Sequence, residues 1–117
     1  MLVVEDDEDI RGFVAIVLQD AGYAVSEAGN GAEALLQLEQ ASPEVILLDM
    51  KMPVMDGWEF AHRYKAISAA PAPIIVMTAA RDARIRATEV NAVEVLSKPF
   101  DVDDLLAAIA RVVPNHH

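Results

Sequence analysis

Chemically useful side chains stand at the ends of four separate apolar segments of this chain. They are Glu5 with Asp6, Asp49, Thr78 and Lys98. Because the carboxyl ends of parallel strands meet at one edge of a sheet, we expect these side chains to converge on a single crevice. Three carboxylates, a hydroxyl and an ammonium group can there bind a divalent cation and handle a phosphoryl group.

The carboxylates favour a magnesium site. If the first and third strands are neighbours, Glu5 and Asp6 face Asp49, and two carboxylates ~4 Å apart repel by about 4 kcal/mol at an effective dielectric constant of 20. A cation or a raised pKa relieves that repulsion. Mg²⁺ suits a few carboxylates, a backbone carbonyl and retained waters, and we expect Mn²⁺ to substitute for it. The acidic run lacks the glycine and closing glutamate of an EF-hand, and the chain lacks the usual ligand set of zinc.

An oxygen of Asp49 is then suited to attack phosphorus and form a mixed acyl phosphate. Lys98 offers a point charge and Thr78 a hydroxyl for the phosphoryl oxygens. Each residue also has an ordinary interpretation: a solvated loop aspartate, a threonine bonded to the backbone, or a lysine in a turn before proline. Their combination at one sheet edge favours phosphoryl transfer.

Five apolar runs alternate with helical patterns along the chain. The expected strands are residues 2–4, 23–27, 45–48, 74–77 and 93–96, and most of them are almost unbroken apolar runs, which is typical of strands covered on both faces. Helical spacing appears over residues 10–18, 60–64 and 102–113, including Phe13 and Val102 as core positions, with weaker patterns over 32–40 and 82–90. The alternation predicts a flavodoxin-like (βα)5 three-layer sandwich with a parallel sheet of order 2-1-3-4-5.

Composition restricts the class of protein. A chain of 117 residues fits one domain, and 19 acidic against 9 basic residues give a net charge of -10. That charge repels nucleic-acid backbones, so we expect no direct nucleic-acid binding and an output through a partner protein. The absence of cysteine is compatible with a reducing compartment, and no apolar run resembles a signal peptide or membrane span. We therefore expect a cytoplasmic protein without membrane contact.

Over nearly its whole length the chain resembles the receiver domain of two-component response regulators, and is similar to the bacterial chemotaxis receiver. The matching segments are residues 3–7, 47–57, 77–79 and 98–100. The resemblance implies that Asp49 is the phosphoacceptor and that Asp6 binds Mg²⁺ directly. It also implies that Glu5 completes the acidic pocket and that the backbone carbonyl of Lys51 is a further metal ligand.

The same resemblance implies that Thr78 and Lys98 bind the phosphoryl oxygens and that the Lys98–Pro99 peptide bond is cis. The implied phosphodonor is a phosphohistidine on a sensor histidine kinase or a histidine phosphotransfer protein. Such a domain promotes its own phosphorylation and dephosphorylation to control a downstream protein, and is not a metabolic enzyme. Residues 1–113 would form the receiver domain and residues 114–117 a truncated or tag-derived tail, and a phosphorylation-dependent dimer is left open.

Two departures keep alternatives open. Val95 stands three residues before Lys98, where relatives usually carry a mobile aromatic, so one alternative is a receiver-fold interaction module that does not use phosphorylation. A phosphotransferase acting on an external metabolite is less favoured, because the chain has no Walker-type loop and Lys51 replaces a second carboxylate. Three arginines, Arg81, Arg84 and Arg86, form either a basic docking patch or an ordinary solvated helix face.

Overall fold

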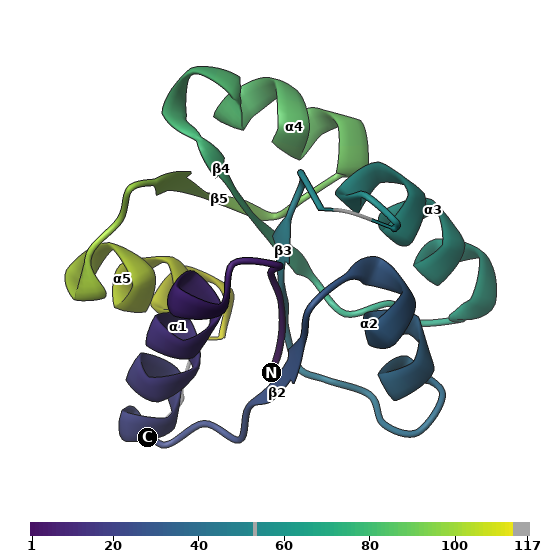
Figure 1. Cartoon of the computed structure of the whole chain (residues 1–117), viewed down its shortest axis with the longest axis horizontal. Coiled ribbons are helices and arrows are strands. Elements are labelled where there is room, and N and C mark those ends of the chain that lie inside the picture. Colours follow the sequence, from purple (N-terminus) through teal and green to yellow (C-terminus); the bar gives the residue numbers. More distant parts are fainter. Residues whose placement is uncertain (53, 114–117) are drawn as a thin grey trace.

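A parallel five-stranded sheet of order β2-β1-β3-β4-β5 forms the centre of the molecule (Figure 1). The computed structural model describes residues 1–52 and 54–113. The strands are β1 (Leu2–Val4), β2 (Ser26–Ala28), β3 (Ile46–Asp49), β4 (Ile74–Ala79) and β5 (Glu94–Lys98). Both the predicted α/β class and the predicted strand order are confirmed.

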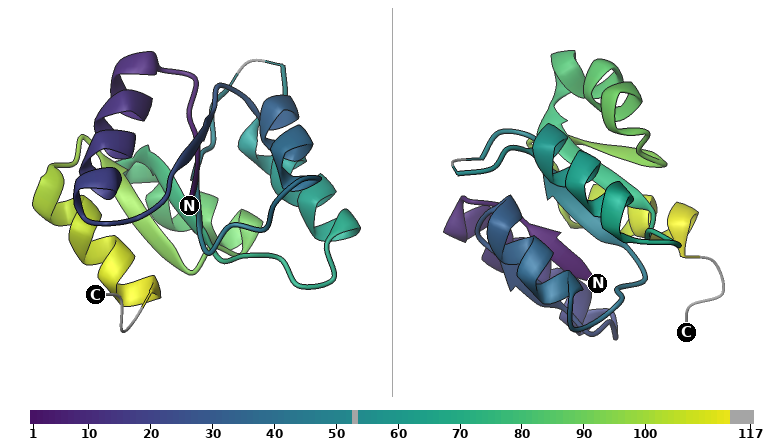
Figure 2. Two further views of the ribbon diagram at one scale, coloured as in Figure 1. Left: turned by 90° about the horizontal axis from the view of Figure 1, so that it is seen from below. Right: turned by 90° about the vertical axis from the view of Figure 1, so that its right-hand side faces the viewer.

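Helices cover both faces of this sheet (Figure 2). They are α1 (Glu8–Asp20), α2 (Gly31–Leu38), α3 (Gly57–Ile67), α4 (Ala83–Val90) and α5 (Val102–Val112), with a short 3₁₀ turn, η1 (Ala80–Asp82), before α4. Buried residues of α1 and α5 join one apolar cluster, and those of α2, α3 and α4 join another. The sheet therefore separates two cores, as expected for a three-layer sandwich.

Strand β3 shows how the sheet divides these cores. Ile46 and Leu48 belong to the cluster beneath α2 and α3, whereas Leu47 between them belongs to the cluster beneath α1 and α5. All three side chains are fully buried. Because successive side chains of a strand point to opposite faces, an unbroken apolar run is what a doubly covered strand requires.

Some predicted boundaries and core positions were wrong. Strand β2 lies at Ser26–Ala28 rather than 23–27, and β5 extends to Lys98 itself. Phe13 and Val102 were expected in the core, yet their side chains are 38% and 41% exposed. The ring of Phe13 packs instead against Phe100, with centroids 6.4 Å apart.

One predicted backbone feature is confirmed. The Lys98–Pro99 peptide bond is cis. Asn91 ends α4 in the left-handed conformation, with φ 56°, which asparagine adopts at lower cost than most residues. The expected tail at 114–117 lies outside the described residues, and none of the helices in the described part of the chain is long and apolar enough to cross a bilayer.

Candidate functional site

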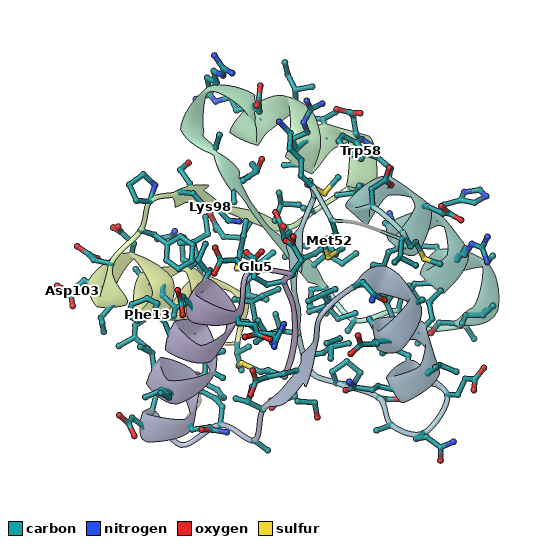
Figure 3. All side chains as sticks on the ribbon, in the orientation of Figure 1. Glu5, Phe13, Met52, Trp58, Lys98 and Asp103 are labelled. Atoms are coloured by element: carbon teal, nitrogen blue, oxygen red, sulfur yellow. The ribbon has the colours of Figure 1, made fainter. Side chains whose placement is uncertain are left out.

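The ends of β1, β3, β4 and β5 surround one hollow of about 310 Å³. Register explains the convergence, because Val4 pairs with Leu48 directly before Asp49, and Ala79 pairs with Lys98. Figure 3 labels Glu5 and Lys98 at this edge of the sheet. The hollow is lined by all six residues singled out from the sequence, together with three neighbours: Glu5, Asp6, Asp7, Ile10, Asp49, Lys51, Thr78, Ala79 and Lys98.

Three carboxylates of this hollow form a candidate cation site. One oxygen each from Glu5, Asp6 and Asp49 lies within 4.8 Å of the others. Glu5 and Asp49 are buried, at 1% and 5% exposed, whereas Asp6 is exposed. A hard divalent cation with several waters fits such a set of oxygen ligands. The predicted proximity of the first and third strand ends is therefore present in the structure.

Lys98 joins two of these carboxylates. Its Nζ lies 2.7 Å from Glu5 Oε1 and 3.3 Å from Asp49 Oδ1. The three residues are far apart in sequence, so the contact depends on the order of the strands rather than on local structure.

The pKa values show the electrostatic cost of this cluster. Burial raises the pKa of Glu5 to about 7, although its hydrogen bond from Lys98 acts in the opposite direction. Burial also raises the pKa of Asp49 above its ordinary range. For Lys98, burial lowers the pKa, but contact with Glu5 and Asp49 outweighs it, so the pKa is raised. The pair of buried carboxyls therefore favours a further positive charge, from a proton or from a divalent cation.

The remaining predicted residues lie around this cluster. Thr78 is buried at 5% exposure near the end of β4. The backbone N–H of Lys51 donates to Asp49 Oδ1 at 3.4 Å, while the Lys51 side chain is exposed beside the hollow. Asp7 has a separate structural role: its Oδ1 accepts from the backbone N–H groups of Asp9 and Ile10 and caps α1.

Two arrangements were not anticipated from the sequence. Arg11 donates to the backbone carbonyl of Glu5, a residue whose side chain belongs to the carboxylate cluster. On the other side of the molecule, Arg86 does not belong to an open basic patch, because it stacks on the Trp58 ring and pairs with Glu89 at 2.9 Å. The Glu5 carbonyl and the Trp58 ring lie on other elements than the arginines that contact them, and hydrophobic periodicity carries no signal for such contacts.

Comparison with known proteins identifies the family. Residues 1–110 match the model of the response regulator receiver domain, so this chain belongs to that family. It is 36% identical over 116 residues to the DNA-binding transcriptional regulator NtrC of Escherichia coli, covering 97% of this chain but only 24% of NtrC.

Solved structures agree with this assignment. The chemotaxis response regulator CheY4 of Vibrio cholerae is 38% identical, with a TM-score of 0.87 and 96% of each chain covered. The response regulator TrrA of Thermotoga maritima, solved with Mg²⁺ and BeF, is 30% identical, with a TM-score of 0.83 and 96% of each chain covered. The chain is therefore a receiver domain with a signalling role, and its three-carboxylate cluster fits the cation named for TrrA.

Proposed function

We propose that this domain accepts a phosphoryl group on Asp49 from a phosphohistidine and thereby controls a partner protein in the cytoplasm. The donor would be a sensor histidine kinase or a histidine phosphotransfer protein. The observation that carries the proposal is the position of Lys98 Nζ, 3.3 Å from Asp49 Oδ1, beside three convergent carboxylates. An aspartate with that surrounding is suited to nucleophilic attack on phosphorus followed by neutralisation of the product.

The proposed transfer balances as a simple displacement. An oxygen of Asp49 forms a bond to phosphorus while the bond from phosphorus to the donor imidazole nitrogen breaks, and that nitrogen keeps the electron pair. Lys98 offsets the negative charge of the transferred group, and the Thr78 hydroxyl donates to one of its oxygens. Positioning and charge neutralisation supply most of the catalysis in such reactions, so no further acid or base is needed on the chain.

Asp6, Asp49 and the backbone carbonyl of Lys51 would hold Mg²⁺, or Mn²⁺ in its place, with Glu5 completing the acidic pocket. The bound cation would supply charge neutralisation at the phosphoryl oxygens. The clustering of three carboxylate oxygens within 4.8 Å supports this ligand set. The raised pKa of Glu5, which results first from burial, further supports a site that gains stability from added positive charge.

The output would follow from the segment after Thr78. A dianionic group on Asp49 would draw the Thr78 hydroxyl toward it and shift η1 and α4, which come next in the chain. Among the described side chains of α4, Val90 alone is buried, so this helix is weakly attached. Val95 is half-buried on β5 and has few rotamers, which makes α4 rather than a swinging aromatic the main moving element.

Acetyl phosphate provides a donor that needs no partner protein. With Mg²⁺ present, intact-mass measurement should show one added phosphoryl group on the parent chain and none on Asp49→Asn. Chelating the cation should prevent the addition. A parent chain that stays unmodified while folded would favour the phosphorylation-independent interaction module, for which Val95 gives some support. Crosslinking to cell proteins with and without acetyl phosphate would then identify the target, a second copy of the chain included.

A further inference from the structure

We infer that Arg11 is a positioning residue for the cation site, because it fixes the peptide plane between Glu5 and Asp6. This inference rests on the proposed magnesium-dependent function. Arg11 lies in the first turn of α1, and helical side chains tilt toward the N-terminus of their helix, which aims this one back at the β1 end. Its Nη1 donates to the Glu5 carbonyl oxygen at 3.0 Å.

The bonded carbonyl has a special place in the chain. Strand β1 ends at Val4, so the Glu5 carbonyl lies beyond the ladder, while the Glu5 N–H still donates to Ala28 at 3.1 Å. That carbonyl belongs to the rigid, planar peptide unit that links Glu5 to Asp6. A bond on each side of Glu5 therefore fixes the backbone from which both acidic side chains project toward the hollow.

Arg11 is itself anchored on β2. Its Nε donates to Glu27 Oε1 at 3.2 Å, and the arginine side chain is only 20% exposed. Gly29 leaves the room for it, because a Cβ at that position would lie 3.3 Å from Arg11 Nη1. The planar guanidinium can bond in two directions at once, to the carbonyl and to Glu27, which the single ammonium of lysine does less rigidly.

Charge and position predict opposite effects, which makes the inference testable. If Arg11 acted only as a nearby positive charge, its removal would strengthen cation binding, by about twofold across a screened separation of ~10 Å. If it positions the two carboxylates, its removal weakens binding, because the loop must then be ordered when the cation enters. We expect Arg11→Gln to raise the Mg²⁺ dissociation constant by about fivefold or more, the equivalent of ~1 kcal/mol.

The experiment titrates Mg²⁺ alone into the folded chain by calorimetry. Arg11→Gln removes the positive charge. Arg11→Lys keeps the charge but loses the planar guanidinium that bonds in two directions, and Glu27→Gln weakens the ion pair that holds Arg11. We expect weaker binding in all three, with the largest loss for Arg11→Gln. Arg63→Gln is the matched control, since Arg63 is an exposed arginine on α3 that pairs with Glu59, and its dissociation constant should equal the parent value.

A second measurement separates positioning from general damage. With acetyl phosphate as donor, Arg11→Gln should need more Mg²⁺ for half-maximal phosphorylation but reach nearly the parent rate at saturating Mg²⁺. Tighter or unchanged Mg²⁺ binding in Arg11→Gln, or parent-like binding in Arg11→Lys, overturns the inference while leaving the proposed function intact. If the parent takes up no phosphoryl group but Arg11→Gln still binds Mg²⁺ more weakly, the proposed function fails and the positioning role stands.

Discussion

At the edge where β1 and β3 end, the acidic residues end or directly follow strands whose apolar residues are buried, whereas α4 buries only Val90 among its described side chains. The acidic edge is held by strand ladders on both sides of β1 and β3. Helix α4 has no continuous apolar stripe, and its polar residues Arg86 and Glu89 contact Trp58 of α3. The difference indicates a rigid site beside a helix that can move at low cost.

A polar cluster joins α4 to α3; it is formed by Trp58 on α3 with Arg86 and Glu89 on α4. Trp58 Nε1 donates to Glu89, and the guanidinium of Arg86 lies 4.8 Å from the centre of the Trp58 ring. Lys65 adds a bond to the Val90 carbonyl at 2.7 Å. Within the described residues, Arg86 Nε is a buried donor without an acceptor, so this attachment also carries a cost.

The largest predicted effect tests the acidic edge. Replacing Lys98 by Met leaves Glu5 and Asp49 buried without the ammonium group that contacts both of them. We expect phosphorylation by acetyl phosphate to slow by about 100-fold, because one donor to the developing charge is lost. Lys65→Met removes the same charge from α3 and should leave the rate nearly unchanged. A Lys98→Met rate close to the parent rate would mean that this ammonium group does not serve the transfer.

The pH dependence of stability tests the same edge. Since the pKa of Glu5 rises from 4.5 to about 7 on folding, chiefly through burial, the folded chain holds the proton more tightly than the unfolded chain. This tighter proton binding adds to the free energy of unfolding. The added stability is fully present below the unfolded pKa and is lost as the pH rises toward the folded pKa. We expect urea unfolding without Mg²⁺ to show this loss between the unfolded and the folded pKa of Glu5. Across that pH range the free energy of unfolding of the parent should fall by about 1–2 kcal/mol relative to Glu5→Gln, after allowing for solvent screening.

Added Mg²⁺ should remove most of that loss, because the cation replaces the proton as the compensating charge. A parent chain whose pH dependence matches that of Glu5→Gln would show that burial at this edge is not costly. The rigidity of the acidic edge would then need another explanation.

A smaller effect is expected at α4. Trp58→Phe keeps an aromatic ring beneath Arg86 but removes the donor to Glu89. We expect global stability to fall by about 1 kcal/mol while amide exchange within α4 speeds up and exchange in β3 does not. Arg63→Gln, which breaks an exposed pair on α3, should change stability by less than about 0.5 kcal/mol. Equal acceleration in β3 and α4 would show that the helix is no looser than the sheet.

The smallest effect concerns the lifetime of the product. The exposed Lys51 side chain stands beside the hollow and can cover a phosphoryl group on Asp49 from water. We expect Lys51→Ala to shorten the acyl-phosphate lifetime by about threefold, or ~0.6 kcal/mol in the barrier. Decay can be followed by intact mass after the donor is removed, and equal lifetimes would reject the idea.

The same contrast explains what the sequence could predict. Strands β1, β3 and β4 are doubly covered, so their apolar runs marked both their positions and the residues at their ends. Strand β2 was placed too early because Tyr23 and Val25 look strand-like but precede the ladder, and the paired segment Ser26–Ala28 is a mostly exposed edge. At an edge, pairing with β1 decides the register more than hydrophobicity does.

The residues around the site likewise include some that the sequence predicted and one that it did not. Glu5, Asp49 and Lys98 were found because strand order alone brings them together. Arg11 was missed because a basic residue in the first turn of a helix opposes the usual dipole preference and looks like a solvated charge. Its role depends on a backbone carbonyl, and the sequence does not show which carbonyls a strand leaves unpaired.

The most direct test of the convergence at Asp49 is to locate the phosphoryl group. Treating the chain with acetyl phosphate and Mg²⁺, then reducing it with borohydride, converts an aspartyl phosphate to homoserine that peptide mass spectrometry can map. We predict homoserine at position 49 alone, and none when Mg²⁺ is chelated. Homoserine at another carboxylate, or equal labelling without the cation, would contradict a site built from Glu5, Asp6, Asp49 and Lys98.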